Sequence, residues 1–306
     1  MLIRSLPSAA PLLALAACVP AVPGSPAPQA SPQPAAATAL RPAPVTTPSS
    51  APAGPASFTF AGELTQGGWL RGQAPGGTVS AQIDAEPLVL DGDGRFFAAL
   101  DRDAPAEARL TATLADGRIV EQALAVAPRA WDIQRVNVAR TAGIPSDSFA
   151  ARRAPELAAI VAARAADTGA QGWRQDFVWP VTGRISGRFG SQRIYRGEPG
   201  SYHSGLDIAP GPGTPYVAPA DGVVVLVAAQ PFSLEGNLLI VDHGAGLNSA
   251  FLHSQSIAVS EGQQVRQGEV LGRVGASGRA TGPHLHWSLM WRGRRLDPLL
   301  FLPPQG

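Results

Sequence analysis

The stretch TGPHLHWSLM, residues 281–290, decides how the C-terminal part of the chain is interpreted. A Thr-Gly-Pro turn signal is followed by a short, mostly apolar run, which is the pattern of a β-strand. Side chains two residues apart lie on the same face of a strand, so His284 and His286 are predicted to project together, with Leu285 and Trp287 on the opposite face. Two imidazoles would then line one cleft, although a strand can also carry two exposed histidines by chance.

A second motif, HSGLDI at residues 203–208, contains a histidine and an aspartate four residues apart. This spacing suits one helix face, but Gly205 and the PGPG run at residues 210–213 argue against a helix. We therefore expect His203 to lie in a loop that leads into a short strand, on which Asp207 points away from its two apolar neighbours. Such a carboxylate needs a partner, and a divalent cation is a good one, although a turn or capping aspartate is the commoner explanation of the motif taken alone.

All five histidines lie in the C-terminal part of the chain, at positions 203, 243, 253, 284 and 286. His253 belongs to AFLHS, residues 250–254, and alternates with an apolar neighbour on a predicted strand. The only cysteine is Cys18, which excludes a multi-cysteine metal site, so a metal would be held by histidine and carboxylate. Two imidazoles and one carboxylate suit a catalytic zinc whose fourth position is left to water, and further histidines can polarise or protonate a substrate.

Four segments resemble the core of the M23 (lysostaphin/LytM-like) zinc metallopeptidase family, over about residues 177–303. They are WPVTGRISGRFGSQR (179–193), APADGVVVLVA (218–228), VDHGAGLNSAFLHS (241–254) and EGQQVRQGEVLGRVGASGRATGPHLHW (261–287). Residues 58–127 are also similar to the β-domain that precedes the peptidase domain in some proteobacterial members. The resemblance implies an antiparallel, LytM-like β-sheet domain, so the expected fold class is mainly β.

The family motifs match this sequence residue by residue. The His-x-x-x-Asp pattern falls on His203 and Asp207, the His-x-His pattern falls on His284 and His286, and the strand histidine falls on His253. The resemblance implies one zinc ion with the ligands His203, Asp207 and His286. It also implies a catalytic pair formed by His253 and His284.

Two further positions near these motifs differ from the proposed site residues. Tyr202, directly before His203, stands where many family members have proline. His243 belongs to a turn motif of the family and is interpreted as structural rather than catalytic. The loop from Tyr195 to Tyr202 is a candidate rim or gate of the substrate cleft.

Residues 1–18 have the layout of an export signal, with Arg4 followed by the apolar stretch Leu6–Ala17. The stretch is too short and too proline-broken for a transmembrane helix, which needs about 20 apolar residues. Its end, LAAC, resembles a bacterial lipobox and predicts lipidation of Cys18 and a membrane anchor; an ordinary signal peptide cleaved near these alanines is the alternative. Residues 19–57, rich in Pro, Ala, Ser and Thr, predict a disordered tether. We expect an exported, periplasmic, lipid-anchored protein, with a preference for the outer membrane.

Between the tether and the peptidase-like core the sequence divides into two parts. Residues 58–127 contain short alternating runs, such as 109–114, separated by Gly-Gly and Asp-Gly signals, which predicts a small β-sandwich with solvated acidic turns rather than a calcium site. Residues 128–176 are interpreted as a linker, with a helix predicted from Pro155 to about Thr168. The formal charge of +1, with 15% charged residues, provides no overall field to hold nucleic acid or an anionic membrane surface.

The resemblance implies a zinc-dependent endopeptidase that hydrolyses peptide cross-links of bacterial peptidoglycan in cell-wall remodelling. The lipobox-like N-terminus, the β-domain and the absence of lysine favour a Gram-negative source, and with it the D-Ala-diaminopimelate cross-link. The alternative is a catalytically silent or gated M23-like module that binds peptidoglycan or activates another wall hydrolase; no regulatory protein is identified. Residues 261–274 also resemble a biotinyl or lipoyl carrier, but such a carrier needs a lysine. A purely structural envelope lipoprotein would leave the histidine cluster unexplained.

Overall fold

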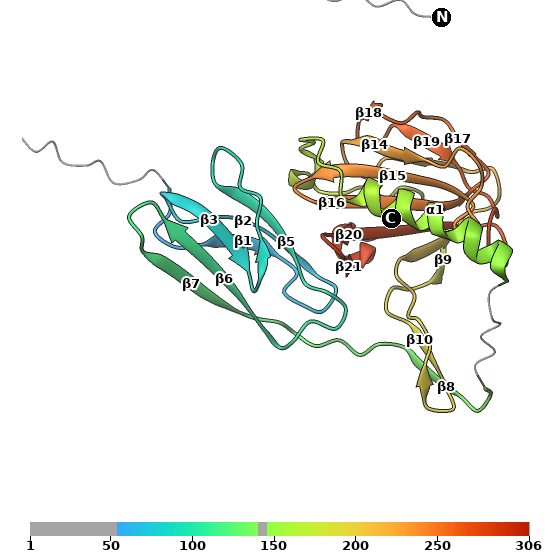
Figure 1. The fold of residues 1–306 in the computed structure, drawn as a ribbon, viewed down its shortest axis with the longest axis horizontal. Helices are drawn as coiled ribbons and strands as arrows, with labels where there is room; N and C mark the ends of the chain where they lie inside the picture. Colours follow the sequence, from blue (N-terminus) through green and yellow to red (C-terminus); the bar gives the residue numbers. More distant parts are fainter. Residues whose placement is uncertain (1–53, 140–145, 306) are drawn as a thin grey trace, which may run out of the picture. The chain divides into compact units, whose positions relative to one another are not determined.

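The computed structural model describes residues 54–139 and 146–305. The predicted export signal, the lipidation site Cys18 and nearly all of the predicted tether lie outside these residues. Over the described residues the chain is mainly β with one α-helix, which confirms the predicted fold class (Figure 1). No helix in this part of the chain is long and apolar enough to cross a membrane.

The N-terminal part of the described chain consists of two antiparallel sheets, as expected for a small β-sandwich. Their strand orders are β1-β2-β5 and β4-β3-β6-β7. Every second side chain of β6 is buried, so one face of its sheet packs inward. Phe96, Phe97 and Leu110 belong to the shared apolar core. The strands are β1 (Thr59–Gly62), β2 (Trp69–Gln73), β3 (Thr78–Ile83), β4 (Glu86–Pro87), β5 (Arg95–Ala99), β6 (Glu107–Leu114) and β7 (Ile119–Ala125).

The C-terminal part is built on an eight-stranded sheet (Figure 1). Its strand order is β18-β14-β15-β16-β20-β12-β9, and β21 pairs with β20. Because β16, β20 and β12 are neighbours, His286 lies between Leu252 on one side and Asp207 on the other. The strands are β9 (Arg184–Gly187), β12 (Leu206–Ala209), β14 (Gly222–Val227), β15 (Asn237–Gly244), β16 (Leu247–Ser254), β18 (Gln264–Val265), β20 (Leu285–Trp291) and β21 (Arg294–Leu296).

Two small sheets complete the C-terminal part, with the strand orders β11-β10-β8 and β13-β19-β17. In the first of them β8, from the segment interpreted as a linker, pairs in parallel with β10. The bounds are β8 (Ile133–Val136), β10 (Gln192–Tyr195), β11 (Glu198–Pro199), β13 (Pro215–Val217), β17 (Ser256–Ile257) and β19 (Val270–Arg273), with short 3-10 helices η1 (Gly172–Arg174) and η2 (Pro298–Phe301).

The α-helix, α1, runs from Asp147 to Arg164, whereas the sequence predicted Pro155 to about Thr168. The N-cap residue is Ser146, whose hydroxyl accepts a hydrogen bond from the amide of Phe149 at 3.2 Å. Pro155 therefore lies inside the helix. The prediction was wrong because it relied on the preference of proline for the first helical turn and did not use the Ser-Asp start signal upstream.

One face of α1 packs on the large sheet. Ala163 is buried against apolar side chains of β14, β15 and β16. Near the other end of the helix, Arg153 donates to both carboxylate oxygens of Glu235, at 2.6 and 2.7 Å. This bidentate pair ties the helix to the loop between β14 and β15, so α1 is a packed part of the C-terminal unit.

His243 on β15 is fully buried and is hydrogen-bonded at both ring nitrogens. Nδ1 lies 2.7 Å from the carbonyl oxygen of Asp221, which can only accept, so Nδ1 carries the hydrogen. Nε2 then accepts from the hydroxyl of Ser249 at 2.7 Å, and the same hydroxyl oxygen accepts from the indole of Trp287 at 3.2 Å. A neutral His243 thus joins β15, β16 and β20, in agreement with the structural role expected for it.

Acid is expected to destabilise the fold partly through His243. Burial lowers the pKa of His243 below its ordinary value, so between that lowered pKa and about 6.5 the unfolded chain binds a proton that the folded chain does not. The stability that comes from a neutral His243 is fully present above the pKa of this histidine in the unfolded chain. It is lost as the pH falls from there through its lower pKa in the folded chain. In urea unfolding at a series of pH values, the free energy of unfolding should fall less on acidification in His243→Gln than in the unaltered protein. If the free energy of unfolding fell equally with pH in the two proteins, a buried, neutral His243 would be contradicted.

Candidate metal centre

Three predicted residues converge on one point. His203 lies in the loop before β12, Asp207 lies on β12, and His286 lies on β20. The distance from Asp207 Oδ1 is 2.8 Å to His286 Nδ1 and 3.0 Å to His203 Nε2, and the two nitrogens are 3.1 Å apart. The three atoms therefore form a compact group that could hold one metal ion.

The two strands place these side chains as the sequence alternation predicted. Asp207 stands between Leu206 and Ile208, which are both fully buried, while its own side chain is only partly buried. On β20, Leu285 and Trp287 are also fully buried. Because Asp207 and His286 are register partners, the antiparallel pairing of β12 and β20 brings the carboxylate beside the imidazole.

The hydrogen bonds of His203 test whether this group suits a metal. Its Nδ1 lies 3.0 Å from the carbonyl oxygen of Arg188, which can only accept, so Nδ1 carries the hydrogen. In the neutral ring Nε2 then holds a bare lone pair that faces the carboxylate of Asp207 at 3.0 Å. Two lone pairs at this distance repel unless a cation lies between them. A backbone carbonyl that fixes the far nitrogen is the usual arrangement of a metal-binding histidine.

The ionisation states also suit a cation. Burial opposes ionisation of Asp207, yet without a metal the His203 and His286 rings lower the pKa of its carboxyl well below the ordinary range when the nitrogen that faces Asp207 carries a proton; for His203 this is the doubly protonated ring. Burial lowers the pKa of His286. For His203, burial also disfavours the charged ring, but the hydrogen bond and charge of Asp207 raise its pKa above the ordinary value. The group therefore contains an ionised carboxylate, Asp207, and a neutral imidazole, His286. A proton and a metal ion compete for the second imidazole, His203.

Two glycines make room for the group, and the sequence interpretation missed their role. A Cβ at Gly205 would lie 2.7 Å from His286 Nε2 and 2.6 Å from the carbonyl oxygen of Trp287. A Cβ at Gly187, on the neighbouring strand β9, would lie 2.4 Å from Asp207 Oδ2. Any side chain at either position would displace one of the three converging residues. Gly205 was used only to exclude a helix, and no local pattern around Gly187 indicated a site.

His253 and His284 form a second pair beside the first group. Their ring centroids are 4.9 Å apart, and His284 Nε2 lies 3.7 Å from Asp207 Oδ1. Each ring has its Nδ1 beside a carbonyl oxygen, that of Ser277 at 2.9 Å and that of Gly282 at 2.8 Å. Both Nδ1 atoms therefore carry a hydrogen, and in the neutral rings both Nε2 atoms are acceptors. Burial lowers the pKa of His253, which favours its neutral form.

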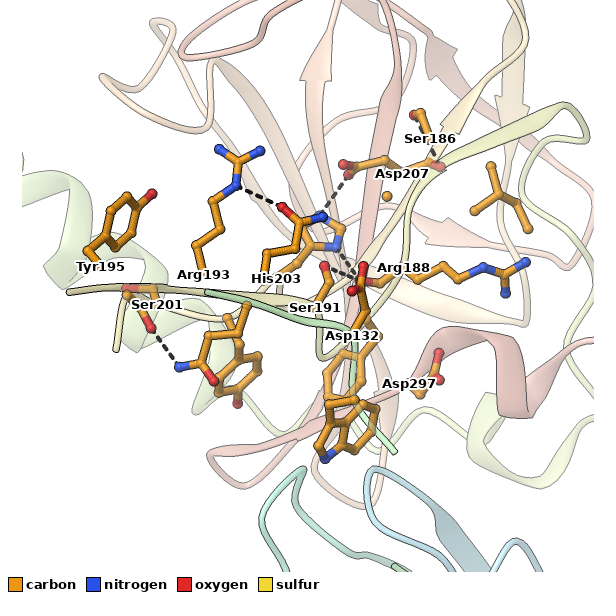
Figure 2. A pocket seen from close by; sticks show the side chains of 18 of the residues that line it. Asp132, Ser186, Arg188, Ser191, Arg193, Tyr195, Ser201, His203, Asp207 and Asp297 are labelled. Carbon is orange, nitrogen blue, oxygen red and sulfur yellow. Dashed lines mark hydrogen bonds and ion pairs between the residues drawn. The ribbon is translucent and has the colours of Figure 1, made fainter. Parts of the chain in front are cut away.

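A cleft of about 1600 Å³ opens from His203 and Asp207. In the view of Figure 2, Arg193 and Tyr195 lie on one side of His203 and Arg188 lies on the other. Much of the segment 195–202 lines this cleft, as the sequence interpretation suggested. Trp131, Asp132 and Gln134, which that interpretation assigned to the linker, line it as well, because β8 pairs with β10. No motif in the sequence indicated this.

Comparison with known proteins identifies this class of site. Residues 201–298 match the model of Peptidase family M23. A crystal structure of a protein described as an M23 peptidase from Pseudomonas aeruginosa is similar, with a TM-score of 0.59 and 29% identity, covering 78% of this chain and 95% of that one. Residues 201–298, which carry this site, therefore form a Peptidase M23 domain, which confirms the resemblance seen in the sequence.

Two curated relatives are similar over the same part of the chain. Peptidoglycan DD-endopeptidase ShyA of Vibrio cholerae is 38% identical over 120 residues, which make up 38% of this chain and 27% of ShyA. The lipoprotein NlpD/LppB homolog of Pseudomonas aeruginosa is 35% identical over 132 residues, or 43% of this chain and 40% of that protein. The chain therefore spans well under half the length of these relatives.

Proposed function

We propose that the protein is a zinc-dependent endopeptidase that hydrolyses peptide cross-links of bacterial peptidoglycan. The observation that carries the proposal is the convergence of His203 Nε2, Asp207 Oδ1 and His286 Nδ1 within hydrogen-bonding distance of one another. Two neutral imidazole nitrogens and one carboxylate are a donor set that zinc prefers at catalytic sites. We propose these three residues as the ligands.

Zinc, when bound there, would acidify a water molecule toward a pKa of about 7 and polarise the scissile carbonyl group. The remaining chemistry belongs to His253 and His284. Because each ring holds its hydrogen on Nδ1 against a carbonyl oxygen, each Nε2 can accept a proton from the attacking water. The protonated ring can then stabilise the developing oxyanion or return the proton to the leaving amine.

The substrate proposal rests on relatives and on the cleft. Relatives named as peptidoglycan DD-endopeptidases support peptidoglycan, and we propose the D-Ala-diaminopimelate cross-link as the bond. Arg188, Arg193 and Arg279 line the cleft, and none of them forms an ion pair within the described residues. Stem peptides of peptidoglycan carry carboxylates, which guanidinium groups bind well.

We also propose that Cys18 is lipidated and anchors the protein in the bacterial envelope, with residues 19–57 as a tether, 58–127 and 128–176 as the preceding β-domain and linker, and 177–303 as the peptidase domain. One relative is named as a lipoprotein, and two are named as peptidoglycan endopeptidases. The silent or gated module is the weaker alternative, because every residue of the proposed set is present in the converging arrangement.

Two substitutions on one strand should separate the proposed roles. His286→Ala removes a ligand, so it should lose both bound zinc and activity. His284→Ala leaves the three ligands, so it should retain zinc while its activity falls by roughly a hundredfold or more, as for loss of a general acid or base. Zinc content is measured by elemental analysis and activity by release of muropeptides. A metal-free His284→Ala together with a zinc-loaded His286→Ala would reverse the assignment.

The activity itself is tested with purified protein and cross-linked peptidoglycan, with and without a zinc chelator. The expected result is conversion of dimeric to monomeric muropeptides, identified by mass, that stops with chelator and resumes when zinc is restored. The new termini identify the bond that was cut. Intact cross-links from protein that contains zinc would instead favour the silent or gated module.

A further inference from the structure

The loop at residues 188–191 holds His203 by three hydrogen bonds. The imidazole Nδ1 lies 3.0 Å from the carbonyl oxygen of Arg188. The backbone amide of His203 donates to the carbonyl of Ser191 at 2.8 Å, and the amide of Gly190 donates to the carbonyl of His203 at 2.8 Å. The position and ring orientation of His203 therefore depend on how firmly this loop is held.

The loop is held from the N-terminal sheet pair by Arg102, in the segment between β5 and β6. The guanidinium donates from Nε and Nη2 to the carbonyl of Gly190, at 3.3 and 3.0 Å, and from Nη2 to the side chain of Gln192 at 3.2 Å. Arg102 is 6% exposed, which is unusual for an arginine. The guanidinium of Arg102 therefore fixes Gly190, whose amide donates to the carbonyl of His203.

Two aromatic rings, those of Tyr202 and Trp131, pack against the guanidinium group of Arg102. Its central carbon lies 4.6 Å from the ring centroid of Tyr202 and 5.2 Å from that of Trp131. Gly190 has a φ of +82°, and a Cβ there would lie 2.1 Å from the Trp131 ring, so this ring also closes directly on the loop. Tyr202 directly precedes His203 and is the residue that stands where many family members have proline.

We propose that Arg102 is a positioning residue for the metal centre, acting through Gly190 and Tyr202 on His203. The N-terminal sheet pair then contributes to metal binding, although no hydrogen bond or ion pair joins its described residues to the proposed ligands. Lysine could not replace this arginine, because an ammonium group lacks both the planar fork and the stacking face. The proposal rests on the proposed function for the identity of the metal, but its direct readout is affinity for the metal rather than catalysis.

The test compares zinc dissociation constants of the purified protein and its variants by competition with a chromophoric chelator. Arg102→Met and Arg102→Lys should both bind zinc roughly tenfold more weakly, the usual size of effect for residues that orient a metal ligand. Tyr202→Leu should weaken binding in the same direction, while Tyr202→Phe, which keeps the ring, should not. The matched control is Arg71→Gln, because Arg71 also lies in the N-terminal sheet pair but bonds Asp176 instead of the 188–191 loop.

The role would be overturned if folded Arg102→Lys and Tyr202→Leu bound zinc as tightly as the unaltered protein, or if Arg71→Gln weakened binding equally. Folding of each variant is checked by thermal unfolding. Should Arg102→Met fail to fold, the Arg102→Lys and Tyr202 variants still decide the question. If the unaltered protein binds zinc but cuts no cross-links, the proposed function fails while the affinity comparison remains a valid test of Arg102.

Discussion

The carboxylate of Asp207 is the group on which the site depends, because one of its oxygens lies within 3.0 Å of two imidazole nitrogens. This contact requires that β12 and β20 pair antiparallel with Asp207 opposite His286. It also requires a loop that returns His203 to the same point. A partly buried carboxylate of this kind is stable only with hydrogen-bond donors or a cation, and the carbonyl on the far side of His203 leaves the near nitrogen without a hydrogen in the neutral ring. The site is thus built to receive a cation.

The sheet behind the site is tied together by buried side chains and hydrogen bonds. Leu285 and Trp287 fill the core on the face opposite the histidines, and the Trp287 indole continues through Ser249 to the neutral His243. These hydrogen bonds leave little freedom for β20 to slip, and a slip of one residue would exchange the buried and cleft-facing side chains. The paired strands therefore fix Asp207 and His286, whereas the loop and hairpin at residues 188–200 form part of the wall of the cleft.

Sequence reasoning predicted the parts of the site that follow from local periodicity. Alternation on a strand placed His284 and His286 on one face and Asp207 between two buried neighbours, and the glycines and prolines after His203 excluded a helix. The division into ligands and catalytic pair came from family resemblance rather than from spacing, and it remains a proposal. The mainly β fold class was predicted correctly from short alternating runs and turn signals in residues 58–127 and from the family resemblance in residues 177–303.

Features that depend on distant pairing were not predicted. The pairing of β8 with β10 joins segments about sixty residues apart, and the contact of Arg102 with Gly190 joins the loop between β5 and β6 to the loop between β9 and β10. The start of α1 was missed because a proline preference competed with a capping signal. Gly187 and Gly205 are required by the bulk of side chains that approach them from other strands, which a single sequence does not display.

We propose above that one zinc ion is held by His203, Asp207 and His286. It is tested most directly by a crystal structure of the zinc-loaded protein with anomalous data collected on both sides of the zinc absorption edge. We expect one zinc peak bonded to His203 Nε2, Asp207 Oδ1 and His286 Nδ1, with His253 and His284 outside its coordination sphere. A peak coordinated by His253 or His284 in place of one of the three, or no zinc peak in this cleft, would contradict it.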